Sequence, residues 1–351
     1  MKKSTVKILV TSVGGLIIPS LLSKWRSSFR FDYRFFGVDM DPNAIGRQFV
    51  DEFDTVPPAN DKKYAKELLR ICKRYQINYL LPFSDPEADV LSKVAKKFYA
   101  ADITILGSGE KQTSICVNKK RLLQELHRLG LETPAFYVPK NWSEAKDVIN
   151  KLGFPRNQLI IKPIVSAGSR GFRILTNEFS EFHEVFGMKR ETKITLKRLA
   201  HLYNEYNERK LTPNLIFMEY LQGLDFNIDA LCDHGKLIHC VAQERIAPKH
   251  GPVQIGKISH DKKIIKAVDQ IVSSLNLHFM VNIEMAYPDG KGNRNPLLYE
   301  INPRPSAAII ATEEAGIHML DDAIRLHKGE KLSTITPLPM IMYRYWDEYF
   351  E

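Results

Sequence analysis

The sequence predicts an α/β protein in which a parallel N-terminal sheet is followed by further strands and helices, in two or three domains altogether. Three observations support this. Strand and helix patterns alternate over the first 110 residues, a new helix pattern begins after residue 116, and the later strands are joined by short glycine-containing turns. Strands that alternate with helices favour a parallel sheet. With 351 residues, 44% of them hydrophobic, the chain can bury the cores of two or three domains.

The first domain is expected to be doubly wound. Strands are predicted over 7–12, 33–41, 77–85 and 103–107, and a helix over 64–75. The turn "TSVGG" after the first strand, with Asp39 in the second, imitates a dinucleotide-binding unit. Only Gly14 and Gly15 are present, however, and the three-glycine spacing is missing. We therefore expect a turn that needs glycine and no NAD(P) site.

The rest of the chain continues with a helix that ends at Gly130, before Pro134. Strands are predicted in 158–175 on either side of a loop, and a polar helical segment over 186–213 reads as an insertion. Further strands and helices are predicted at 215–221, 226–232, 236–246, 263–277, 278–287, 297–302 and 307–330. The tail 331–351 has no clear pattern.

Composition excludes several classes of protein. No run approaches the roughly 18 apolar residues of a transmembrane helix, and the apolar start reads as a strand, a turn and a helix rather than as a secretory signal. The four cysteines lack metal-ligand spacing, and they are few for a secreted protein built on disulfides, so a reducing cytoplasm is expected. The net charge of +9 suits a phosphate-binding site or a merely basic surface. The sequence shows no basic stripe interleaved with aromatic residues, so nucleic-acid binding is not expected.

Lys162 lies in the apolar strand pattern "QLIIKP", and a buried lysine is costly unless an anion neutralises it. The loop that follows, Ser166 to Gly171, offers small residues and backbone N–H groups that can surround phosphate oxygens. The loop lacks the P-loop pattern, and an ordinary hairpin turn is the alternative.

The stretch "LLYEINPRPS" places Glu300 and Asn302 on one face of a predicted strand. Glu284 lies in the strand just before the turn. If the two strands pair, three oxygen ligands converge, as hard Mg²⁺ requires. A solvated face of a hairpin is the alternative, although paired acids without a cation would repel each other.

These features occur together in an order that resembles the ATP-grasp superfamily, and within it the carbamoyl-phosphate-synthase-like proteins. The resemblance rests on Lys119, Lys162, the small-residue loop, "FMEYLQGLDFNIDAL" and "IEMAY…YEINPRP", and it covers about 6–328. It implies a Rossmann-like pre-ATP-grasp domain followed by a two-lobed ATP-grasp fold. The implied domains are 1–112, a small lobe 113–218 with the insertion 186–213, a metal-binding lobe 219–330, and the tail 331–351.

The resemblance also implies roles for individual residues. Arg304, Arg245 and Lys162 are the implied catalytic residues, with Arg304 against the transferred phosphate. Mg²⁺, with Mn²⁺ as an alternative, is expected on Glu284, Glu300 and Asn302. ATP is expected on Lys119, Lys162, Ser166, Gly168, Ser169, Gly171, Glu219, Tyr220, Leu221 and Asp225, where Asp225 takes the ribose. The sequence departs from the family at Asn118, where relatives carry Asp, so Lys120 is an alternative to Lys119.

The expected activity is that of a cytoplasmic carboxylate–amine ligase. ATP converts a small-molecule carboxylate into an acyl-phosphate, an amine or other nucleophile attacks it, and ADP and phosphate leave. Two alternatives stay open: phosphorylation of bicarbonate or carbamate, and a nucleotide-binding regulator without turnover. The chain is expected to be a monomer or a homodimer without nucleic-acid or membrane partners. His250 and His260 are expected to be structural, because neither has an identifiable partner.

Overall fold

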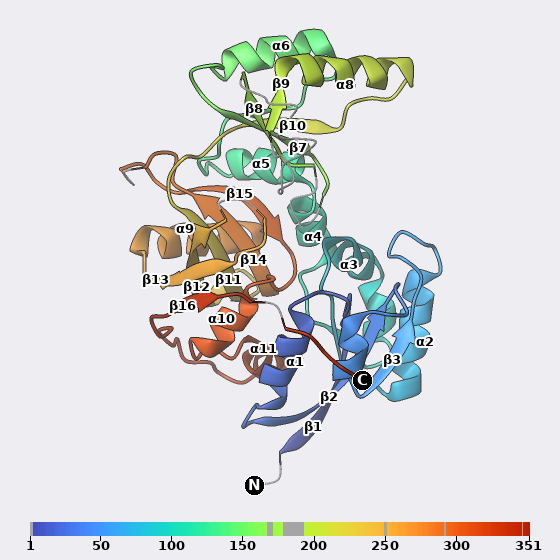
Figure 1. Ribbon diagram of the computed structural model, residues 1–351. Coiled ribbons are helices and arrows are strands. Elements are labelled where there is room, and N and C mark those ends of the chain that lie inside the picture. The colour runs from blue at the N-terminus through green and yellow to red at the C-terminus, as the bar shows by residue number, and fades with distance from the viewer. Residues whose placement is uncertain (1–2, 167–170, 178–192, 249–250, 291–292, 346) are drawn as a thin grey trace. The chain divides into compact units, whose positions relative to one another are not determined.

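The computed structural model describes residues 3–166, 171–177, 193–248, 251–290, 293–345 and 347–351. It confirms the α/β prediction. Among these residues there are two five-stranded sheets and one six-stranded sheet, with helices packed against them (Figure 1). No helix in the described ranges is long and apolar enough to cross a membrane.

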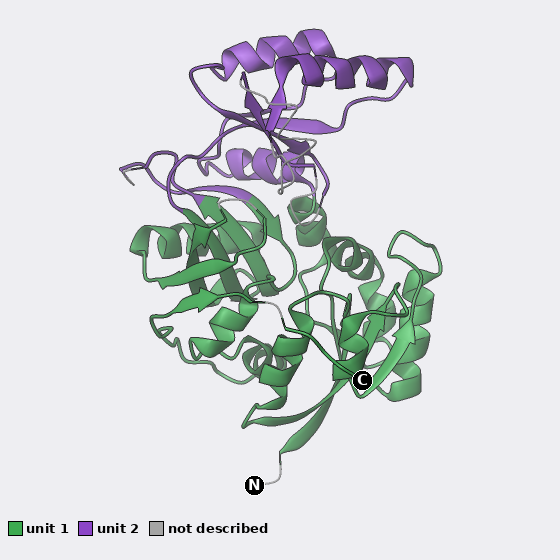
Figure 2. Ribbon diagram, viewed as in Figure 1, with its two compact units in different colours: residues 1–117, 225–285, 300–351 green, residues 118–224, 286–299 purple. Residues whose placement is uncertain are grey.

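The chain divides into two compact units (Figure 2). Unit 1 contains residues 1–117, 225–285 and 300–351, and unit 2 contains residues 118–224 and 286–299. The N-terminal domain and the segment that carries the predicted metal ligands therefore belong to the same unit. The predicted phosphate-binding lysines belong to the other unit.

The N-terminal sheet of unit 1 has the strand order β3-β2-β1-β4-β5, and its registered pairs are all parallel. Ile8 and Val10 of β1 join one buried cluster and Leu9 joins another, because successive side chains point to opposite faces of a sheet. Helices on both faces explain the nearly continuous apolar strand pattern. The elements are β1 Ser4–Thr11, α1 Ile18–Arg26, β2 Phe31–Asp39, η1 Ile45–Phe49, β3 Glu52–Thr55, α2 Tyr64–Tyr75, β4 Tyr79–Leu81, α3 Asp85–Tyr99, β5 Thr104–Ile105 and α4 Glu110–Cys116.

The turn after β1 is occupied by the protein's own carboxylate. The Gly14 N–H donates to Oδ2 of Asp39 at 2.7 Å. A Cβ atom added at Gly14 would lie 3.0 Å from that same oxygen. The close approach of this carboxylate explains the glycine in the turn.

The six-stranded sheet has the order β15-β14-β11-β12-β13-β16 and lies mostly in unit 1. Its last strand comes from the C-terminal tail, where Ile255 of β13 pairs with Tyr343 of β16. The elements are β11 Asp225–Asp233, β12 Lys236–Ala247, β13 Ile255–Ser259, α9 Lys262–Leu275, β14 Phe279–Ala286, β15 Leu297–Asn302, α10 Ile309–Glu314, α11 Met319–His327 and β16 Ile341–Tyr343.

The sheet of unit 2 has the order β6-β10-β7-β8-β9. Figure 1 shows α6 and α8 side by side over this sheet. Of the predicted insertion 186–213, residues 186–192 lie outside the described residues. Residues 193–208 form β9 and α8, and α8 buries Leu199 and Tyr203 in the core of the unit. The elements are α5 Lys119–Arg128, β6 Phe136–Tyr137, α6 Trp142–Lys151, β7 Leu159–Pro163, β8 Arg173–Thr176, β9 Lys193–Thr195, α8 Leu196–Glu208 and β10 Leu215–Glu219.

Candidate active site

The three predicted metal ligands lie on neighbouring strands of unit 1. Glu284 is in β14, and Glu300 and Asn302 are in β15, which is next to β14 in the sheet. The amide nitrogen of Asn302 donates to Oε1 of Glu284 at 3.3 Å. Asn302 is buried, whereas both glutamates are half-buried. The structure therefore brings Glu284 and Asn302 into direct contact from separate strands.

A chain of buried amides continues from Asn302 into the sheet. Its Nδ2 donates to Oδ1 of Asn282 at 3.0 Å, and Nδ2 of Asn282 donates to Oδ1 of Asn227, also at 3.0 Å. Nδ2 of Asn227 in turn donates to Oγ of Ser306 at 3.3 Å. All four side chains are buried, so each bond fixes an amide orientation that would be costly to change. Because these bonds use the nitrogen of Asn302, its amide oxygen is the atom that can bind a cation.

Arg245 lies between two of the predicted site carboxylates. Its Nε is 3.3 Å from Oδ2 of Asp225, and its Nη2 is 3.6 Å from Oε2 of Glu284. Nη1 also donates to the Gly251 carbonyl. The guanidinium is buried, and its positive charge offsets the two carboxylates that the resemblance assigns to the ribose and to the metal.

Arg304 is held by contacts on both sides of its guanidinium. Its Nε lies 3.1 Å from Oδ1 of Asp85, at the start of α3, and Nη1 donates to the Pro305 carbonyl at 2.8 Å. The flanking prolines, Pro303 and Pro305, lock their own φ angles and limit the backbone freedom around the arginine. Asp85 is a contributor that the sequence reasoning missed. It follows β4 at the carboxyl end of a parallel strand, which is where α/β sheets usually place functional groups.

Two buried lysines of unit 2 come from α5 and β7. Nζ of Lys119 donates to the Ser166 carbonyl at 3.0 Å and lies 3.4 Å from Ser166 Oγ. Nζ of Lys162 lies 5.1 Å from the centroid of the Tyr299 ring. Lys120 is exposed. Lys119, rather than Lys120, is thus the lysine that reaches the loop after β7.

The departure from the family at Asn118 has a local explanation. Asn118 is the N-cap of α5, and its Oδ1 accepts from the Arg121 N–H at 3.0 Å. Asparagine and aspartate cap helices about equally well, so the helix start that positions Lys119 is kept.

The small-residue loop is described only at its ends, because Gly168 and Ser169 lie outside the described residues. Gly171 has φ +78°, and a Cβ atom there would lie 2.8 Å from the ring of Pro163. Only glycine fits both requirements at the point where the chain enters β8.

The predicted adenine segment, Glu219 to Leu221, is fixed at its first residue. Glu219 exchanges backbone and side-chain bonds with Ala135, since its N–H donates to the Ala135 carbonyl at 2.9 Å and its Oε2 accepts from the Ala135 N–H at 3.3 Å. Leu221 is buried. After it, the Gly223 N–H donates to the Tyr287 carbonyl at 2.9 Å. Backbone bonds therefore hold the first residue of the segment and the turn that follows the segment.

The side chains of unit 1 fit a hard divalent cation. Two carboxylates and one amide oxygen, with no thiolate or imidazole among them, are the ligand types that Mg²⁺ prefers. The lysines of unit 2 fit phosphate oxygens, because each is a buried ammonium group beside a strand end or loop. The donor sets therefore agree with the cofactors that the resemblance implies.

Two family models match the chain. Residues 211–347 match the family described as ATP-grasp in the biosynthetic pathway with Ter operon. Residues 8–106 match the family described as PylC-like, N-terminal domain. The first match contains the predicted metal ligands and the second contains most of the N-terminal sheet.

Known proteins of related sequence include the carbamoyl phosphate synthase large chain of Archaeoglobus fulgidus. It is 25% identical over 250 residues, which cover 68% of this chain and 21% of that protein. The chain thus spans about a fifth of the length of the curated relatives it matches.

Two solved structures share the fold over nearly the whole chain. One is N5-carboxyaminoimidazole synthetase from Staphylococcus aureus complexed with ADP. Its TM-score is 0.71 at 15% identity, and the match covers 97% of this chain and 82% of that one. The other is the biotin carboxylase domain of 2-oxoglutarate carboxylase from Hydrogenobacter thermophilus, with MgADP, ADP and bicarbonate. Its TM-score is 0.67 at 17% identity, covering 93% and 70%. The resemblance to ATP-grasp proteins is confirmed, and so is the predicted fold class.

Proposed function

We propose that the protein is an ATP-dependent ligase that activates a carboxylate as an acyl-phosphate and passes the acyl group to an amine, releasing ADP and phosphate. The observation that carries this proposal is the contact of Asn302 with Glu284. Glu300 lies in the same strand as Asn302, and Arg304 follows Asn302 by two residues. Support comes from the fold shared with ADP-bound and MgADP-bound proteins.

The chain's own residues supply positioning and charge, which is most of what phosphoryl transfer needs from a protein. Glu284, Glu300 and the Asn302 oxygen would hold Mg²⁺, which when bound neutralises charge on the nucleotide phosphates. Lys119 and Lys162 would neutralise phosphate oxygens of the nucleotide.

Arg304 would stabilise the charge that develops on the transferred phosphoryl group. Its contact with Asp85 holds the guanidinium in place before substrate arrives. The substrate carboxylate oxygen attacks the γ-phosphorus, the bond to the β,γ-bridging oxygen breaks, and ADP leaves. The amine nitrogen then attacks the acyl carbon, loses a proton, and expels inorganic phosphate.

The test is a screen for release of ADP and phosphate against pooled small carboxylates and amines, with Mg²⁺ present. A productive pair is then repeated with an ¹⁸O-labelled carboxylate. The proposal requires ¹⁸O in the released phosphate, because a carboxylate oxygen bridges to phosphorus in the acyl-phosphate. Release of AMP and pyrophosphate would refute the mechanism and leave the fold assignment intact.

A second candidate is phosphorylation of bicarbonate. The bicarbonate in the biotin carboxylase domain and the likeness to carbamoyl phosphate synthase favour it. It predicts ADP release that needs bicarbonate and no organic carboxylate. If Mg-ATP raises the melting temperature but no substrate pool gives turnover, a regulatory nucleotide-binding role replaces both readings.

A further inference from the structure

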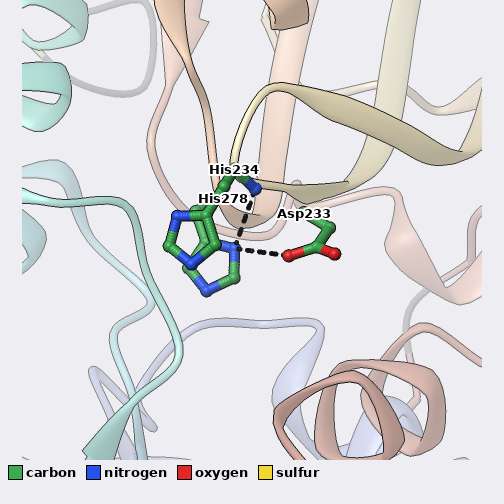
Figure 3. A group of neighbouring side chains, drawn as sticks. All are labelled: Asp233, His234 and His278. Carbon is green, nitrogen blue, oxygen red and sulfur yellow. Dashed lines mark hydrogen bonds and ion pairs between the residues drawn. The ribbon is translucent and has the colours of Figure 1, made fainter. Parts of the chain in front are cut away.

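A cluster of two histidines and an aspartate lies outside the candidate active site. Asp233 is the last residue of β11, His234 lies in the turn to β12, and His278 immediately precedes β14 (Figure 3). One potential ligand atom from each residue lies within 4.8 Å of the others. Nδ1 of His278 is 3.9 Å from Oδ1 of Asp233. The two imidazole rings are stacked, with their centroids 3.8 Å apart and their planes 15° from parallel.

The two loops that carry this cluster are tied to each other and to the neighbouring loop after β5. The Gly235 N–H donates to the Leu277 carbonyl at 2.8 Å. Ser108 fixes the backbone of His278 from both sides, because its Oγ accepts from the His278 N–H at 3.0 Å and donates to the His278 carbonyl at 2.8 Å. The cluster is therefore built on a defined backbone.

The residue after His278 has an unusual conformation. Phe279 is buried and has φ +57°, a left-handed conformation that is unfavourable for a bulky residue. The positive φ values of His234 and Gly235, +42° and +86°, are those of a tight hairpin turn and need no further explanation. Phe279 is the first residue of a strand, so no such turn accounts for it. Strain of this kind is kept where the surroundings over-determine it.

The chemistry of the cluster suits a metal of the zinc class better than Mg²⁺. Two imidazole nitrogens and one carboxylate oxygen, with a water in the fourth position, form a common zinc ligand set. His234 is exposed and Asp233 half-buried, so both side chains can turn toward an ion beside the fixed His278.

The cluster and the predicted Mg²⁺ ligands lie at opposite ends of the same sheet. Asp225, which contacts Arg245, begins β11, and Asp233 ends it. Eight steps along a strand at ~3.3 Å each separate the two aspartates by about 26 Å. A metal at the cluster would therefore act independently of the proposed nucleotide chemistry.

We propose that Asp233, His234 and His278 bind one transition-metal ion of the zinc class, and that this ion joins the β11–β12 turn to the loop before β14.

The experiment is a calorimetric titration of the full chain with Zn²⁺ near pH 7.5, in excess Mg²⁺ so that oxygen-ligand sites are occupied. The wild-type protein should bind one equivalent, and His234→Gln and His278→Gln should each weaken binding by roughly 100-fold, since even outer-shell partners reach that loss. His260→Gln, a change of an exposed histidine before α9, is the matched control and should bind as the wild type does. Wild-type protein that binds no Zn²⁺, or a His234→Gln variant with unchanged affinity, overturns the proposal.

A second readout separates metal binding from loss of fold. His234 is exposed, so its substitution should leave the melting temperature of the metal-free protein unchanged. Zn²⁺ should raise the wild-type melting temperature by mass action and should not raise that of His234→Gln. An equal rise in both proteins also overturns the proposal.

Discussion

The amide nitrogen of Asn302 donates a hydrogen bond of 3.0 Å to Oδ1 of Asn282, two residues before Glu284 in β14. Asn282 is fixed in turn by Asn227 and by the Ile228 carbonyl, which accepts from Asn282 Nδ2 at 3.2 Å. A buried amide can present either its oxygen or its nitrogen to a ligand, and this chain of bonds selects the oxygen for Asn302.

The first prediction is that Asn282→Ala raises the Mg²⁺ concentration needed for half-maximal turnover. Without the acceptor, the Asn302 amide loses its fixed orientation, and outer-shell losses of this kind cost about 10- to 100-fold in metal affinity or activity. Stability should also fall by about 1–3 kcal/mol, because buried partners lose a bond. Steady-state rates against Mg²⁺ at saturating ATP measure the first effect, and urea unfolding measures the second.

The control for this variant is Asn141→Ala, which removes the N-cap of α6. Asn141 Oδ1 accepts from the Glu144 N–H at 2.9 Å, and loss of such a cap costs about 1 kcal/mol. It should destabilise the protein and leave the Mg²⁺ requirement unchanged. If both variants shift the Mg²⁺ requirement equally, destabilisation alone explains the effect.

The second prediction concerns the ion pair between Asp85 and Arg304. Asp85→Asn keeps the shape but removes the charge that holds the guanidinium 3.1 Å away. We expect kcat to fall by about 10-fold, a loss typical when a residue that orients a functional side chain is removed, and we expect the KM for ATP to stay unchanged. Asp89→Asn, which breaks an ion pair with Lys93 on the same helix, should keep wild-type kinetics. An Asp85→Asn enzyme with wild-type kcat would show that Arg304 needs no partner.

The third prediction follows from Asp229, a buried carboxyl that accepts bonds from Thr312 Oγ1 and Gln243 Nε2. Burial raises its pKa from the ordinary value of 3.8 to about 6. Between these values Asp229 binds more protons in the folded protein than in the unfolded chain, so its contribution to stability falls as pH rises from about 4 to about 6. The contribution of this carboxyl amounts to about 3 kcal/mol.

Asp229→Asn should remove this part of the pH dependence, as measured by urea unfolding at several pH values from 4 to 7. Thr312→Val should have the opposite effect on the pH dependence of stability. The Thr312 hydroxyl favours the ionised form, so its loss should raise the pKa further and extend the decline above pH 6. Parallel stability curves for wild type and Asp229→Asn would contradict the assignment.

The contact between Glu284 and Asn302 follows from patterns that a sequence displays, whereas the contact between Asp85 and Arg304 does not. Side chains two apart in a strand share a face, so polar residues at Glu300 and Asn302 inside an apolar run already suggest a common ligand. Asn282 shares its face with Glu284 for the same reason, and that spacing is the signal by which it could have been found. Asp85 reaches Arg304 only through the fold of unit 1, and no local spacing predicts this.

The helices and strands also divide into those that their own sequence pattern predicts and those that depend on the rest of the fold. Long periodic segments are predicted well, as for α2, where the predicted and observed ends coincide at Tyr64 and Tyr75. The tail gave no prediction, because a three-residue strand such as β16 is stabilised by pairing with β13 rather than by its own pattern. The polar residues of 193–213 suggested a surface segment, but Leu199 and Tyr203 of α8 pack into the core of unit 2. A few apolar residues at helical spacing are enough for that.

The last prediction tests the role of Glu300 itself. Glu300→Gln is nearly isosteric, and the fold should survive, because removing one of two neighbouring acids relieves repulsion. It also removes a negative oxygen from a cation that needs hard ligands, so turnover should fall by orders of magnitude. Added Mg²⁺ should recover part of the loss if the cause is weaker metal binding. Arg304→Ala should instead keep ATP binding, lower the rate, and gain nothing from Mg²⁺, since its charge acts on the transferred phosphate. A Glu300→Gln protein with normal turnover at low Mg²⁺ would reduce this strand to a polar face without a metal.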